Sequence, residues 1–269
     1  MYEKKISRAN PGLIAFCLDD SGSMQDNLPG TTDPKFRWVA RYLAIILMEL
    51  LARSTEVKAD SVVIKPRYYV HVLLYGSKPK LWGNETMDIE AAVERYTNQG
   101  KSLGLGGKLS GTDAATAFQE EYRYLQQAVI DPRFQGSFPS MLFHLTDGMS
   151  GTDASPIAKQ IKQLSTQDGH VLIVNAFIGT QTSLKYSGPG DFPGYLSPKE
   201  AGPSTDNLRL FDMSSEVPAC IHENLVEDGI FPSLRPGARL FFDVRTKEML
   251  KHVIQVVGSL GSRADRQAR

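Results

Sequence analysis

The fold of this chain is best predicted from one stretch, Gly12-Leu13-Ile14-Ala15-Phe16-Cys17-Leu18-Asp19-Asp20-Ser21-Gly22-Ser23. Its first half is apolar without alternation, which is typical of a central parallel strand that is covered on both faces. Its second half changes abruptly to carboxylates and hydroxyls, which predicts a polar loop at the carboxyl end of that strand. Because open α/β sheets bind ligands beyond this end, the stretch predicts an α/β fold with a ligand site directly after the first strand.

The rest of the chain continues an alternation of strands and helices. Apolar and β-branched runs predict further strands, including one short edge strand, at residues 68–75, 81–82, 140–145, 171–178 and 208–211. Apolar residues at helical spacing and capping signals predict helices at residues 35–55, 88–96, 113–131, from 155, 217–226 and 247–257. The alternation favours a doubly wound, mainly parallel central sheet flanked by helices.

Composition narrows the functional class. The chain has 269 residues, of which 41% are hydrophobic, and this is enough for one large domain. Its formal net charge is zero, so there is no general basic field to attract nucleic acid. Neither a signal peptide nor an apolar run of membrane-spanning length is present, and Cys17 and Cys220 lack a zinc-binding spacing. We therefore expect a cytoplasmic protein that neither spans a membrane nor binds nucleic acid.

Five residues form the candidate site. Asp19, Ser21 and Ser23 follow the first strand, Thr112 precedes a predicted helix, and Asp147 follows the strand predicted at residues 140–145. Hydroxyl and carboxylate oxygens suit a hard cation such as Mg²⁺ or Mn²⁺ better than they suit zinc or copper. None of the five is an obvious nucleophile with its own base, so the set predicts binding rather than catalysis.

Three motifs of this chain resemble, in type and in order, the metal-ion-dependent adhesion site of a von Willebrand factor A (vWA) domain. They are Asp19-Asp20-Ser21-Gly22-Ser23, Ser110-Gly111-Thr112 and Thr146-Asp147-Gly148. The resemblance covers residues 10–227 and extends to the compact cytosolic bacterial members of that family. It implies a Rossmann-like vWA fold in which Ser21, Ser23 and Thr112 bind the metal through their hydroxyls. Asp19 and Asp147 would act mostly through a water. Residues 228–269 would then be a C-terminal extension with one helix and a flexible tail.

Together with the chemistry of the site, the resemblance implies a metal-dependent protein–protein interaction module, not an enzyme. A partner's Asp or Glu would complete the metal's coordination. One alternative is a Mg²⁺-dependent phosphohydrolase of the haloacid-dehalogenase type, but its motif requires a second aspartate where this chain has Ser21. Another alternative is a vWA scaffold whose metal site is unused. Asp20 has no predicted role beyond that of an exposed loop carboxylate, and residues 106–109 are expected to form a flexible loop that positions Thr112.

The partner surface is predicted in the long segment of residues 179–207. It follows a strand, so it should leave the sheet on the same side as the metal, and it is rich in glycine and proline. Long irregular loops are usually functional or disordered. If the segment is ordered, Tyr186, Phe192 and Tyr195 are the aromatic residues expected to contact the partner.

Overall fold

The apolar run after residue 11 forms the central strand of a seven-stranded sheet. In the computed structural model, which describes residues 1–58, 61–148, 150–178 and 184–258, the strand order is β11-β10-β7-β1-β4-β5, and β6 also pairs with β4. The strands are β1 (Gly12–Asp19), β4 (Tyr68–Tyr75), β5 (Pro79–Leu81), β6 (Met87–Asp88), β7 (Met141–Thr146), β10 (Leu172–Phe177) and β11 (Phe241–Asp243). Strands β11, β10, β7, β1 and β4 are parallel to one another, whereas β5 and β6 pair with β4 in the antiparallel sense. The predicted mainly parallel sheet is therefore confirmed.

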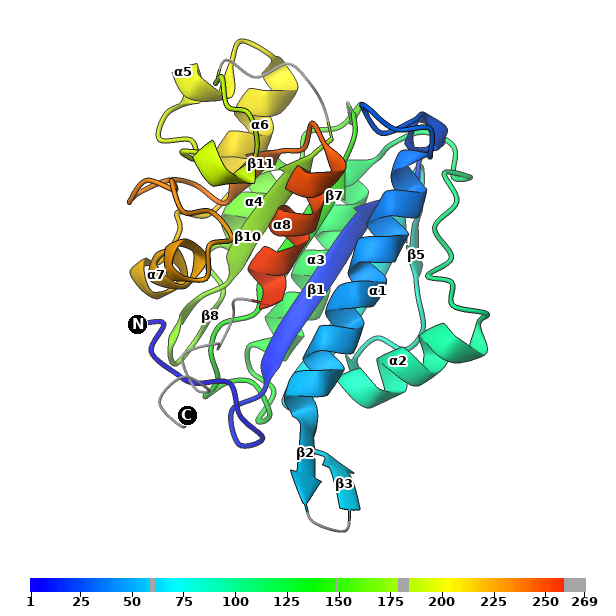
Figure 1. Cartoon of the computed structure of the whole chain (residues 1–269), viewed down its shortest axis with the longest axis vertical. Helices are drawn as coiled ribbons and strands as arrows, with labels where there is room; N and C mark the ends of the chain where they lie inside the picture. Colours follow the sequence, from blue (N-terminus) through cyan, green and yellow to red (C-terminus); the bar gives the residue numbers. More distant parts are fainter. Residues whose placement is uncertain (59–60, 149, 179–183, 259–269) are drawn as a thin grey trace.

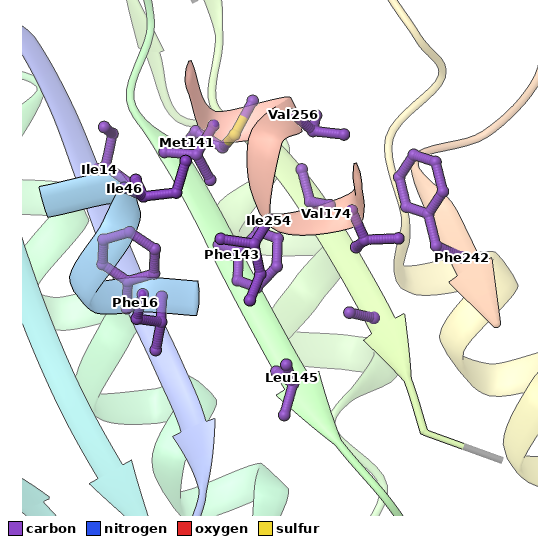
Figure 2. Close-up of a cluster of buried hydrophobic side chains, with 14 of the residues drawn as sticks. Ile14, Phe16, Ile46, Met141, Phe143, Leu145, Val174, Phe242, Ile254 and Val256 are labelled. Carbon is purple, nitrogen blue, oxygen red and sulfur yellow. The ribbon is translucent and has the colours of Figure 1, made fainter. Parts of the chain in front are cut away.

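Helices cover both faces of the sheet (Figure 1). The near face carries α1 (Lys35–Ser54) and α8 (Lys247–Gly258), with α2 (Ile89–Asn98) beside α1, and the far face carries α3 (Ala114–Ala128) and α4 (Ser155–Ile161). Successive side chains of β1 point to opposite faces. Ile14 and Phe16 enter the core under α1 and α8, while Ala15 and Cys17 pack against the far layer. Figure 2 shows the near core, to which Phe143 of β7 and Ile254 of α8 both belong. Burial on both faces explains why β1 lacks alternation in the sequence.

The remaining elements are short. Between β10 and β11, the chain forms the short helices η2 (Pro189–Asp191), α5 (Pro198–Ala201), α6 (Thr205–Met213) and α7 (Ala219–Glu227). Two small antiparallel hairpins pair β2 (Thr55–Lys58) with β3 (Ser61–Ile64) and β8 (Ser165–Thr166) with β9 (Gly169–His170). The strand predicted at residues 208–211 is wrong, because this run lies inside α6. Its buried residues Asn207, Leu210 and Phe211 follow the helical three-to-four-residue spacing, which a run of four residues could not reveal.

The segment after residue 227 contributes to the same sheet. β11 pairs with β10 as its edge strand, and α8 packs against α1 in the near layer. The helix predicted at residues 247–257 is confirmed by α8. The predicted flexible tail, residues 259–269, lies outside the described residues. In the part of the chain that is described, none of the helices has the length and apolar character needed to cross a membrane.

Candidate metal centre

The ends of β1 and β7 bring the first candidate residues together. The two strands are paired in parallel with Leu18 opposite Leu145, so the residues that follow each strand emerge side by side. The Thr146 hydroxyl donates to Asp19 Oδ2 across 2.7 Å, and the backbone N–H of Ser21 donates to Asp19 Oδ1 across 2.9 Å. Asp19 is fully buried. Both of its carboxylate oxygens are thereby fixed, and the chain turns at Asp19 into the short helix η1 (Gly22–Gln25).

Two serine hydroxyls and a second carboxylate lie beyond this turn. Ser23 Oγ donates to Asp147 Oδ1 across 2.8 Å and lies 3.1 Å from Ser21 Oγ. Because the single Ser23 proton is directed to Asp147, Ser21 is the donor between the two hydroxyls. Neighbouring ligands of an octahedral Mg²⁺ with bonds of about 2.0–2.1 Å are about 2.9 Å apart, which is close to the 3.1 Å between the two serine hydroxyls. Four of the five predicted residues are thus joined in one network.

Thr112, the fifth predicted ligand, belongs to the loop that precedes α3. The Ser150 hydroxyl donates to the Thr112 carbonyl across 3.2 Å and accepts from the Ala114 N–H across 2.9 Å. Asp113 caps α3 by accepting from the Thr116 N–H across 3.0 Å. These bonds fasten the Thr112 loop to the loop that follows β7, at the same end of the sheet as the serines.

Asp20 is buried rather than exposed, which corrects the prediction for this residue. Only 4% of Asp20 is accessible, and its Oδ1 accepts from the N–H groups of Gly106 and Gly107 across 2.7 and 2.6 Å. Gly107 has a positive φ of 61°, and a Cβ there would lie 3.0 Å from the backbone nitrogen of Gln25, so the position favours glycine. The glycine-rich loop is therefore anchored at this point to the segment that carries the serines.

Lys35, the first residue of α1, is a member of the site that the sequence did not predict. Its ammonium lies 2.7 Å from Asp147 Oδ2 and 3.3 Å from the Ser23 carbonyl oxygen. The Lys35 side chain is 13% exposed and that of Asp147 is fully buried. In the sequence, Lys35 looks like the first polar residue of an amphipathic helix, and nothing in its spacing from Ser23 connects it with the site.

The chemistry of the donors fits a small, hard cation. Within the described residues, no group of three or more His, Cys, Asp or Glu side chains is arranged to hold a metal ion. The donors that converge here are instead hydroxyls supported by carboxylates, as Mg²⁺ and Mn²⁺ prefer. Burial raises the pKa of Asp19, and hydrogen bonds from Ser21 and Thr146 oppose that rise. A cation nearby would further favour the charged carboxylate.

Of the three predicted aromatic anchors, two lie in the core and the third is partly buried against it. Phe192 and Tyr195 are fully buried, and the Phe192 ring lies 5.6 Å from that of Phe242 in β11. Tyr186 is partly buried and donates to Asp243 Oδ1 across 2.7 Å, and the Tyr195 hydroxyl donates to the same carboxylate. In this structure these side chains hold their segment on the sheet edge and are not available as exposed contacts. Residues 179–183 of the predicted partner loop lie outside the described residues.

Comparisons with known proteins concern the fold. No protein-family model matches this sequence, and no curated protein matches it. The structure is similar to that of the conserved hypothetical protein BatB from Bacteroides thetaiotaomicron, with a TM-score of 0.50 and 12% identity over 93% of this chain and 99% of that chain. Two structures of proximal thread matrix protein 1 from the mussel byssus have TM-scores of 0.49, with 16% and 13% identity over 92% of this chain. The chain covers 48% and 47% of those mussel chains, or about half their length.

Proposed function

We propose that this chain is a vWA-type domain that binds a divalent cation, Mg²⁺ or Mn²⁺, and through it the carboxylate of a protein partner. The observation that carries the proposal is the network at the carboxyl ends of β1 and β7, which joins Asp19, Ser21, Ser23 and Asp147. These are the residues that correspond to the adhesion-site motif, and they come from segments more than one hundred residues apart.

Each residue of the site has a distinct task in this proposal. Ser21, Ser23 and Thr112 would hold the cation through neutral hydroxyl oxygens. Asp147 accepts the Ser23 proton, which turns the free lone pairs of that hydroxyl away from the carboxylate. Asp19 fixes the backbone of Ser21 and, through Thr146, the end of β7. A bound Mg²⁺ or Mn²⁺ would supply an electron-poor coordination position that favours an incoming carboxylate.

The surroundings of the site support binding over phosphate hydrolysis. The position at which a haloacid-dehalogenase-like enzyme needs its second aspartate is Ser21, whose hydroxyl bonds to Ser23. The neighbouring carboxylate, Asp20, is directed to the amides of Gly106 and Gly107. A general acid for hydrolysis is therefore not supplied by either residue.

The proposal is tested by affinity capture from native lysate with the full chain as bait, in Mg²⁺ and in EDTA. A partner should be retained by the wild type in Mg²⁺ and lost in EDTA, and it should also be lost with Thr112→Ala. Ser77→Ala is the matched control, because Ser77 is exposed on the same rim and bonds to Ser110 outside the network. Equal retention by the wild type in both buffers would contradict a metal-bridged contact.

A further inference from the structure

Lys35 places a positive charge where the proposed cation would act. Its ammonium contacts Asp147 Oδ2 at 2.7 Å, while the other oxygen of that carboxylate accepts from Ser23 at 2.8 Å. Asp147 thus has its ionic partner within the chain itself. Asp19 and Asp147 together carry two negative charges when ionised, and Lys35 neutralises one of them.

Asp26 offers the same ammonium a second position. Lys35 Nζ lies 3.9 Å from Asp26 Oδ2, and the Asp26 side chain is 76% exposed. A lysine side chain has several rotatable bonds and a compact charge, so it can move between neighbouring carboxylates while its backbone stays in α1. One of the two acidic side chains, Asp147, is buried within the site, and the other, Asp26, is exposed at its rim.

We infer that Lys35 is a built-in counter-cation of this site, which holds Asp147 when no metal is bound and lowers the affinity for a divalent cation. The inference rests on the proposed metal site and adds a means of regulating it. Like charges repel strongly in a partly buried site. A divalent cation must therefore bind against the ammonium or displace it towards Asp26, and either event weakens binding. If the divalent cation displaces the ammonium, metal binding would change the contacts that Lys35 makes at the start of α1.

The test is calorimetric titration of the full chain with Mg²⁺ and Mn²⁺. Lys35→Gln removes the charge and should bind at least about tenfold more tightly than the wild type. Lys35→Arg keeps the charge and should bind within a few-fold of the wild type. Arg37→Gln is the matched control, since Arg37 is exposed and pairs with Asp33 rather than with a site residue. If Lys35→Gln binds no more tightly than Arg37→Gln does, the inference is overturned.

Thermal unfolding gives a second readout that does not require partner binding. In EDTA, Lys35→Gln should melt at a lower temperature than the wild type, because Asp147 then loses its counter-charge. Saturating Mg²⁺ should raise the melting temperature of this variant by more than that of the wild type. An equal Mg²⁺ shift in both proteins would contradict the inference. If Lys35→Gln does not fold in EDTA, Asp26→Asn replaces it and should weaken Mg²⁺ binding more than the exposed Asp33→Asn does.

The outcomes separate this inference from the proposed function. Binding by the wild type with no gain in Lys35→Gln overturns the role of Lys35 and leaves the metal site standing. Binding only by Lys35→Gln supports the role of Lys35 and overturns metal dependence of the native protein. An absence of binding in both proteins overturns both.

Discussion

Two regions of this molecule bury carboxylates, and they do so in opposite ways. At the carboxyl end of the sheet, Asp19 and Asp147 each have a hydrogen-bond donor on both oxygens, from Ser21, Thr146, Ser23 and Lys35. On the far face, Glu121 of α3 is fully buried, and neither of its oxygens has a hydrogen-bond partner among the described residues. The carboxylates are similarly buried in the two regions, but only those at the sheet end accept hydrogen bonds.

The difference determines which group can carry charge. Burial raises the pKa of Glu121 to about 8 and lowers that of His71 to about 4, so both are neutral at pH 7. His71 Nδ1 lies 2.6 Å from the Glu85 carbonyl and must donate to it, which leaves Nε2 unprotonated, 3.7 Å from Glu121 Oε1. A protonated Glu121 faces that nitrogen without an ionic attraction. The carboxylates at the sheet end, in contrast, each have hydrogen-bond donors on both oxygens.

The largest effect expected from this comparison is a loss of stability with rising pH. The folded protein keeps the Glu121 proton up to about pH 8, whereas the unfolded chain releases it near its ordinary pKa of 4.5. Unfolding is therefore favoured as pH rises between these values, by up to about 5 kcal/mol in total. The window from pH 6.5 to 8 contains roughly 2 kcal/mol of this decrease. The buried histidines contribute only below their usual pKa, and Lys162, whose pKa burial lowers to about 8, begins to contribute, with the opposite sign, only at the top of the window. Urea unfolding of the wild type across that window measures the decrease.

Glu121→Gln is the control for that experiment. Its amide has nearly the same shape but does not ionise in this range, so the variant's free energy of unfolding should not fall on account of this residue. The variant should be more stable than the wild type at pH 8. Parallel pH profiles of the two proteins would show that Glu121 is not the group responsible.

A smaller loss of stability is expected when Asp20 is replaced, because its carboxylate accepts hydrogen bonds from backbone amides. Asp20→Ala would leave the part-buried N–H of Gly106 and the buried N–H of Gly107 without their acceptor and should cost about 2 kcal/mol of stability. It should also weaken metal binding, because the loop that leads to Thr112 loses its anchor. Asp20→Asn keeps an acceptor oxygen and should recover most of both losses. Denaturant unfolding and Mn²⁺ titration measure the two effects, and an Asp20→Ala protein that matches the wild type in both would contradict this role.

Much of the fold could be predicted from the sequence, because its signals are local. The uninterrupted apolar runs of β1 and β7 indicate strands covered on both faces, and the helical spacing of α1 and α8 indicates which sides are buried. Short elements were harder to predict from the sequence. β11 has only three residues, and its place in the sheet depends on pairing with β10, which no local pattern encodes.

The candidate site was predicted in part for the same reason. Asp19, Ser21 and Ser23 follow one strand in a recognisable spacing, and Asp147 follows another that lies beside it. Lys35 and Asp20 could not be assigned, since their roles depend on which loop lies opposite each side chain. Phe192 and Tyr195 were predicted as surface residues because glycine and proline surround them, but they pack into a cluster with distant phenylalanines, including Phe231 and Phe242.

The most direct test of the central claim is titration of the full chain with Mn²⁺, monitored by the electron paramagnetic resonance signal of the free ion. We predict that the wild type binds a single Mn²⁺ and releases it when Mg²⁺ is added. Ser21→Ala should bind at least about tenfold more weakly, since it removes a proposed ligand, whereas Ser77→Ala should bind as the wild type does. An undiminished free-ion signal with the wild type, or equal binding by Ser21→Ala, would contradict a metal site built from these hydroxyls.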